Sequence, residues 1–107
     1  MTGEMTLAWE GDQAADATLE LNDDMTKHKE IVFEVRNAAA TAAGSGLFYA
    51  VPVFLFKQYY VNGASPQNSY MLSPYDNQYC YIRYVDDMHI LFDFATTTRM
   101  RRIWFMD

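Results

Sequence analysis

Apolar and polar residues alternate along most of the chain, in runs of five to eight positions. Turn-forming residues, chiefly Asp, Asn, Gly, Ser and Pro, separate these runs. A repeat of two residues indicates a strand with one buried face, whereas an amphipathic helix repeats about every 3.6 residues. No segment has a convincing helical repeat. The pattern therefore predicts an all-β chain.

The alternation predicts short strands at 5–9, 17–21, 31–36, 48–56, 69–72, 79–84, 89–94 and 100–105. Apolar side chains spaced two apart point to the same side of a strand. The residues expected to share one face in this way are Met5, Leu7 and Trp9, then Ile31, Phe33 and Val35, and later Ile90, Phe92 and Phe94. Pro52 has no N–H to donate to a neighbouring strand, which predicts a sheet edge or a bulge there.

Two stretches interrupt the alternation. Residues 37–46 are rich in Ala but contain Gly and Ser and lack an apolar stripe, so we expect a long mobile loop with at most one helical turn. Residues 62–78 form a polar tract with one short strand inside it. About eight short strands in this chain predict a single domain, residues 1–107, folded as an antiparallel β-sandwich or jelly roll.

The chain is unusually aromatic for its size, with eight Tyr and seven Phe among 107 residues. A two-layered domain of this length has a thin core, because it buries only about two thirds of its unfolded surface. Such a core cannot enclose every ring. We therefore expect some rings at the surface, in a subunit interface or in a binding site.

The formal net charge of −6 arises within residues 1–30, which contain eight carboxylates and only two lysines. This balance argues against nucleic acid as a partner, because a phosphate backbone requires a basic stripe. One cysteine excludes a disulfide within the chain. The longest apolar run, residues 47–56, is too short to cross a bilayer, and the N-terminus lacks the features of a signal peptide, so we expect no membrane insertion.

Residues 81–87, with the sequence YIRYVDD, contain a conspicuous pair of carboxylates, Asp86 and Asp87. The string looks like the catalytic turn of reverse transcriptases, in which two aspartates hold metal ions for phosphoryl transfer. Two aspartates also suit a turn between strands. A polymerase needs a third, distant carboxylate and further elements that 107 residues cannot supply, so we favour the turn.

Other reactive side chains also have ordinary structural interpretations. His28 and His89 lack the spacing of metal ligands, and we expect exposed imidazoles without a role, although either could approach a carboxylate. Cys80 occupies an inward-facing position, which favours a small buried hydrophobe over a nucleophile. Asp23 and Asp24 are expected to cap a turn, because no calcium-binding loop follows them. The sequence therefore predicts no catalytic set, no metal site and no cofactor.

Tyrosines gather around the polar tract. Tyr combines a flat apolar face with a hydroxyl at low entropic cost, which suits surfaces that bind sugars or proteins. Ordinary packing on a strand or at a subunit interface explains the same rings equally well. Long loops on a rigid scaffold commonly carry function. The residues predicted to contact a receptor are Tyr59, Tyr60, Asn62, Gln67, Asn68, Tyr70, Tyr75 and Asn77.

The opening of the chain combines an aromatic residue and a nearby glycine (Trp9 and Gly11), a Thr-Leu strand (Thr18 and Leu19) and a hydrophobic strand at residues 31–33. This arrangement resembles the start of the small C-terminal domains of tailed-bacteriophage tail fibres. It implies a virion protein, made in the host cytoplasm and assembled as a homotrimer. It also implies that the distal loops bind a host-surface glycan or an outer-membrane protein.

We therefore predict a non-enzymatic domain, the receptor-binding tip of a phage tail fibre. The alternative is a small acidic inhibitor, such as an immunity or anti-defence protein, that uses its N-terminal carboxylates to bind a basic protein. That alternative predicts loss of activity when these carboxylates are neutralised: Asp12, Asp16, Glu20, Asp23 and Asp24. An enzyme would require Asp86 and Asp87 to lie in a cleft with a raised pKa.

Overall fold

The computed structural model describes residues 4–37, 47–59, 69–75, 78–96 and 98–107, with the backbone alone at residues 37, 74 and 75. This part of the chain is built almost entirely of strands. They are β1 (Met5–Gln13), β2 (Ala17–Glu20), β3 (Glu30–Asn37), β4 (Leu47–Pro52), β5 (Tyr70–Tyr75), β6 (Gln78–Asp86), β7 (His89–Ala95) and β8 (Thr98–Met106). The 3-10 helix η1 spans Met25–Lys27 and the α-helix α1 spans Val53–Phe56.

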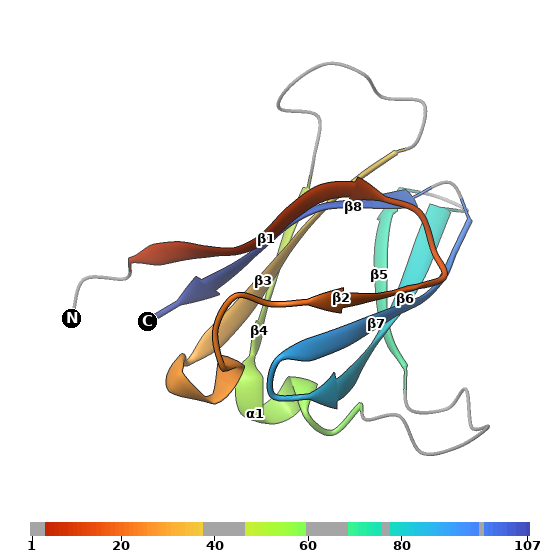
Figure 1. The fold of residues 1–107 in the computed structure, drawn as a ribbon. Coiled ribbons are helices and arrows are strands. Elements are labelled where there is room, and N and C mark those ends of the chain that lie inside the picture. The colour runs from red at the N-terminus through yellow and green to blue at the C-terminus, as the bar shows by residue number, and fades with distance from the viewer. Residues whose placement is uncertain (1–3, 38–46, 60–68, 76–77, 97) are drawn as a thin grey trace.

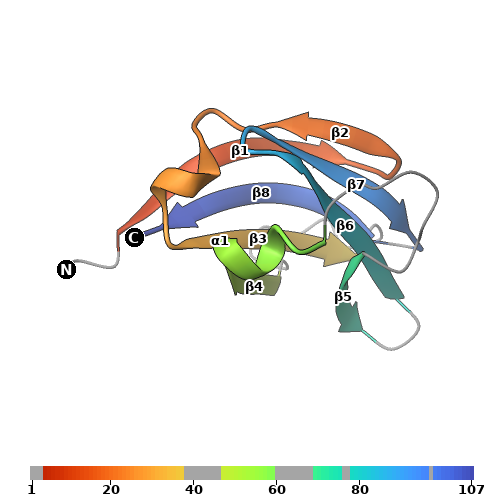
Figure 2. The ribbon, with the colours of Figure 1, turned by 90° about the horizontal axis from the view of Figure 1, so that it is seen from below.

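The strands form two four-stranded sheets that pack face to face (Figure 1). The first sheet has the order β1-β8-β3-β4 and the second the order β2-β7-β6-β5, and all neighbouring strands are antiparallel. Figure 2 gives a second view of the two layers, with β8 and β3 in one and β7 and β6 in the other. The prediction of an all-β antiparallel sandwich of about eight strands is confirmed.

The core lies between the two sheets, and every strand contributes at least one buried apolar residue to it. Ile31, Phe33 and Val35 are fully buried, as their alternation in the sequence predicted. Cys80 is also fully buried, and burial raises the pKa of its thiol to about 12. Because only the thiolate is an effective nucleophile, Cys80 is a packing residue, as predicted.

A bulge changes the face of β1 halfway along the strand. Leu7 lies opposite Trp104, whereas Trp9 lies opposite the buried Ile103, so Ala8 is the extra residue. An extra residue reverses the sides to which all later side chains point. The prediction that Met5, Leu7 and Trp9 share one face is therefore wrong: Trp9 packs against the core, and Leu7 lies on the other face of the sheet.

A second bulge changes the face of β7. Ile82 of β6 pairs with Phe92, but its neighbour Tyr81 pairs with Phe94, which leaves Asp93 as the extra residue. Phe92 is fully buried and Phe94 is 44% exposed. Phe94 therefore does not share the core-facing side of Ile90 and Phe92, contrary to the prediction.

The predicted strand at 48–56 ends earlier than expected. Pro52 closes β4, an edge strand as predicted, and α1 begins at the next residue. The N–H of Val53 donates to the carbonyl of Lys29 (2.9 Å), which fixes the turn of the chain, and Phe56 then reaches the core. Of the predicted loop at 37–46, only Asn37, the last residue of β3, lies within the described residues.

Candidate functional site

Two of the predicted receptor contacts, Tyr59 and Tyr70, meet in the structure. Their ring centroids are 5.2 Å apart with an interplanar angle of 81°. Tyr59 accepts a hydrogen bond at its carbonyl from the N–H of Tyr84 (2.9 Å), and Tyr70 packs against the core. Both rings are half-buried, so they support the end of the second sheet.

The other predicted contacts are not described in full. Tyr60, Asn62, Gln67, Asn68 and Asn77 lie outside the described residues, and Tyr75 is described only as the last residue of β5. Their role therefore stays a prediction.

The outer face of the second sheet carries three partly exposed rings and a methionine, which we call the aromatic surface: Met71, Tyr79, Tyr81 and Phe94. Met71 pairs with Tyr81, and Tyr81 pairs with Phe94, so one row crosses β5, β6 and β7. The ring centroids of Tyr79, Tyr81 and Phe94 lie 5.6–5.8 Å apart. Met71 is 54% exposed and Phe94 44% exposed. Half-exposed rings that contact one another form a continuous apolar patch, the kind of patch that marks a binding surface.

Polar groups in fixed positions border the aromatic surface. Arg83 is almost completely buried, and its Nε atom lies 3.1 Å from Asp93 and 2.9 Å from the Ser69 hydroxyl. Asp93 is the bulge residue that turns Phe94 outward. The bulge therefore adds Phe94 to the rings of β6 and places Asp93 at the border of the aromatic surface.

Only part of this surface could be predicted from the sequence. Tyr79 and Tyr81 belong to the tyrosines that flank the polar tract, but they were not among the predicted contacts. Phe94 continues the alternation of Ile90 and Phe92, so the sequence pattern predicted that its side chain faces the core. No signal of the bulge was present in the sequence, because Phe92, Asp93 and Phe94 alternate as in any strand with one buried face.

The outer face of the first sheet carries a group of paired charges around Glu34, next to the exposed Phe48 on β4. Glu34 is 7% exposed, and its carboxylate accepts hydrogen bonds from Arg102 (3.0 and 3.2 Å) and from the Trp104 indole (3.4 Å). Arg102 also bonds to Glu10 (3.0 Å). Charge-assisted bonds of this kind satisfy both partners within the molecule.

The acidic residues of the N-terminal part are largely engaged within the fold. Asp12 accepts hydrogen bonds from Arg99 (2.9 Å) and Arg36 (2.8 Å), which hold the pKa of its carboxyl below the usual range. Asp24 caps η1 by accepting from the N–H of Thr26 (2.8 Å), as predicted. These carboxylates are tied to internal partners, and neutralising them would disturb the fold as well as any partner contact.

Asp86 and Asp87 serve the turn between β6 and β7. Asp86 accepts from the N–H of Met88 and lies 2.8 Å from Nδ1 of His89, which lowers its pKa. The Tyr84 hydroxyl donates to Asp87 (2.5 Å), and burial together with this bond raises the pKa of Tyr84 to about 12. Both carboxylates have the turn and strand contacts expected of a structural hairpin.

His28 is not the exposed imidazole that the sequence suggested. Its side chain is 11% exposed and stacks on Phe105 with a centroid distance of 4.2 Å. Its two ring nitrogens lie 2.8 Å from Asp107 and 3.1 Å from Asp23, and the bond from His28 lowers the pKa of Asp23. His28 thus joins the turn before β3 to the residue after β8, a contact between residues 79 positions apart.

Within the described ranges, no three His, Cys, Asp or Glu side chains are grouped so that they could hold a metal ion. The helices described here are also too short to span a membrane. The chain matches no known protein family, and no curated protein is similar enough in sequence to indicate a relationship.

Proposed function

We propose that this chain is a non-enzymatic receptor-binding domain of the tail-fibre type, and that its aromatic surface binds a host-surface glycan. The observation that carries the proposal is the contact of Tyr79, Tyr81 and Phe94 on the outer face of the second sheet. The β7 bulge holds the Phe94 ring at the surface beside the two tyrosines of β6. A rigid arrangement of this kind keeps the entropic cost of binding low.

Sugar rings have apolar faces made of C–H groups and rims made of hydroxyls. The aromatic surface offers the matching chemistry, since rings can stack on the C–H face while polar neighbours bind the hydroxyls. Asp93 is 32% exposed at its side chain and lies beside Phe94, where its carboxylate can accept from a sugar hydroxyl. Its bond to Arg83 holds it in place.

The proposal includes assembly as a homotrimer located in the virion. Support for association comes from exposed apolar side chains outside the aromatic surface, among them Phe48 on the edge strand β4, which is 57% exposed. Light scattering on the purified domain tests this part directly. A mass of three chains agrees with the proposal, and a stable monomer contradicts the trimer while leaving the glycan site open.

A glycan array tests the binding function. The wild-type domain is expected to bind a defined subset of surface glycans, and Tyr81→Ala is expected to weaken that binding by about tenfold or more, as for a central ring of an interface. Thermal melting of both proteins shows whether the fold is kept. Retention of glycan binding by a folded Tyr81→Ala would contradict the assignment, and binding only to an outer-membrane protein would contradict the glycan.

A further inference from the structure

Positive charge is distributed unequally between the two sheets. All eight Lys and Arg side chains lie within the described residues, and β3 and β8 of the first sheet carry four of them: Arg36, Arg99, Arg101 and Arg102. The strands of the second sheet contain Arg83 alone, against three carboxylates: Glu20, Asp86 and Asp93. Packed sheets lie about 10 Å apart, so the arginines of the first sheet are remote from a ligand on the outer face of the second.

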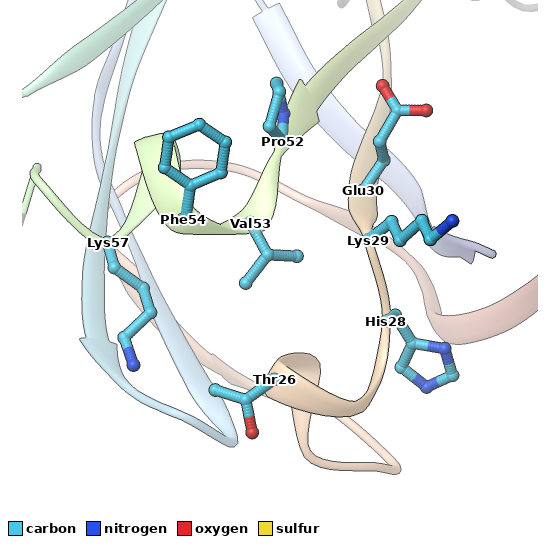
Figure 3. A pocket seen from close by; sticks show the side chains of 8 residues that line it. All are labelled: Thr26, His28, Lys29, Glu30, Pro52, Val53, Phe54 and Lys57. Carbon is cyan, nitrogen blue, oxygen red and sulfur yellow. The ribbon is translucent and has the colours of Figure 1, made fainter.

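The three lysines lie at the end of the sandwich where the turn after η1 faces α1. Lys29 and Lys57 line a pocket of about 570 Å³ there, and Figure 3 shows them on opposite sides of it. Lys57 contacts Asp87 in the turn after β6 (3.4 Å). The end of β6 lies roughly 15 Å along the strand from Tyr81. This separation exceeds the Debye length of about 8 Å at physiological salt, so the lysines act weakly on a ligand at the aromatic surface.

Arg83, the one Lys or Arg of the second sheet, is almost completely buried. Its side chain is 7% exposed, and its Nε atom donates to the Ser69 hydroxyl (2.9 Å) and lies 3.1 Å from Oδ2 of Asp93. The Asp93 side chain is 32% exposed, so it is the accessible half of this ion pair. A ligand at the border of the aromatic surface therefore meets a carboxylate before it meets a guanidinium.

Asp93 offers a ligand hydrogen-bond acceptors and no donor. Its Oδ2 atom faces Arg83, and among the described residues no hydrogen bond or ion pair engages Oδ1. A sugar hydroxyl can donate to this oxygen. A carboxylate, sulfate or phosphate on the ligand would instead approach a like charge and lose its hydration without gaining a partner. The Phe94 ring beside Asp93 supplies the apolar contact that the face of a sugar needs.

We propose that the aromatic surface selects uncharged sugars, with a sugar hydroxyl bound by Asp93, and rejects sugars that carry a carboxylate, a sulfate or a phosphate. This inference rests on the glycan-binding function proposed above, and it names the class of glycan and the residue that selects it. The rings supply the affinity for a sugar face of either kind. The carboxylate of Asp93 supplies the discrimination.

Matched pairs on a glycan array test the selection, each pair being one oligosaccharide with and without a sialic acid or a sulfate. At constant ionic strength, the uncharged members are expected to bind about fivefold or more tightly than their anionic partners, the effect of about 1 kcal/mol of charge repulsion. Equal or tighter binding of the anionic members overturns this inference and leaves the glycan function intact. Binding of no member of any pair overturns the glycan function, and this inference with it.

Asp93→Asn separates the effect of the carboxylate from that of the rings. This change keeps the shape of the side chain, removes its charge and leaves Arg83 without a counter-ion. The preference for uncharged members is expected to fall to about twofold or less, because the repulsion is lost. Thermal melting shows whether the variant is folded, and the matched pairs on the wild type decide the selection without it.

Glu20→Gln is the control for overall charge. It removes one carboxylate from the same sheet, at a side chain on β2 that is 74% exposed. The preference for uncharged sugars is expected to stay as in the wild type. An equal loss of preference in Glu20→Gln and Asp93→Asn would show that the net charge of the domain, and not Asp93, excludes anionic sugars, and would overturn the assignment.

Discussion

On the outer face of the first sheet, charged side chains satisfy one another around Glu34, and Phe48 is exposed beside them on the edge strand β4. The outer face of the second sheet instead presents several rings in mutual contact. The carboxylate of Glu34 is enclosed by Arg102 and Trp104. Phe94 and Tyr81, by contrast, contact each other and remain partly exposed. A face whose polar groups are already paired gains little from a partner, while an exposed apolar patch gains from losing its contact with water. This difference is the reason why we propose the outer face of the second sheet as the glycan-binding face.

The largest expected effect distinguishes the two sides of β6. Ile82→Ala removes a fully buried side chain and is expected to lower the free energy of unfolding by about 3 kcal/mol through cavity formation. Tyr81→Ala, one residue away on the outer face, is expected to cost roughly 1 kcal/mol, since its ring is only half-buried. Urea unfolding measures both values. Equal losses would mean that the aromatic surface is part of the core.

A second substitution tests the paired charges of the first sheet. Glu34→Gln is expected to lower the free energy of unfolding by about 2 kcal/mol, because it weakens the bonds to Arg102 and Trp104 in a nearly buried position. Glu20→Gln on β2 is the control, since that side chain is 74% exposed, and should change stability by less than about 0.5 kcal/mol. Equal free energies of unfolding for the two variants would show that the bonds of Glu34 do not stabilise the first sheet.

Gly11 on β1 tests the packing at the edge of the first sheet. A Cβ atom at this position would lie 2.8 Å from the ring of Trp9, so the indole must move if Gly11 is changed to Ala. We expect a loss of about 1 kcal/mol, typical of mild overpacking, and a change in tryptophan fluorescence. Unchanged fluorescence and unchanged stability would show that the ring does not rest on Gly11.

The smallest expected effect is the acid dependence of the Asp12 bonds. Arg99 and Arg36 lower the pKa of Asp12 in the folded state, so this carboxylate stabilises the fold above its unfolded pKa. That contribution is lost as the pH falls through the lower folded pKa, in the range below about pH 4. Asp12 is 43% exposed, which keeps the effect small. Asp12→Asn should therefore unfold with a weaker dependence on acid than the wild type, and an identical dependence would show that these bonds contribute nothing.

The alternation in the sequence predicted the fold because each buried strand needs apolar residues two apart. Ile31, Phe33 and Val35 follow this rule without interruption and are all buried. It did not predict the bulges at Ala8 and Asp93, because an extra residue is defined by the partner strand and not by the strand itself. The short helix α1 was missed for a related reason: Val and Phe favour strands, and the contact of Val53 with Lys29 overrides that preference.

The candidate site was harder to predict than the fold. Tyr59 and Tyr70 were predicted to contact a receptor, and the structure shows only that their rings contact each other, so their role in binding stays a prediction. The exposure of Phe94 depends on the β7 bulge, and the burial of His28 depends on Asp107 at the other end of the chain. The pocket likewise joins segments about 25 positions apart, the turn after η1 and α1. Such contacts depend on how distant segments of the chain are aligned in the fold, and a local sequence pattern does not specify that alignment.

We propose that the glycan binds the outer face of the second sheet and not that of the first sheet, where the exposed Phe48 is assigned to contacts between chains. The test compares two exposed phenylalanines, Phe94→Ala on β7 and Phe48→Ala on β4, by the affinity per site for a soluble glycan, a quantity that does not depend on assembly. Phe94→Ala is expected to lose affinity by about tenfold, and Phe48→Ala, the more exposed of the two, is expected to bind like the wild type. Loss of affinity in Phe48→Ala with full affinity in Phe94→Ala would contradict the proposal.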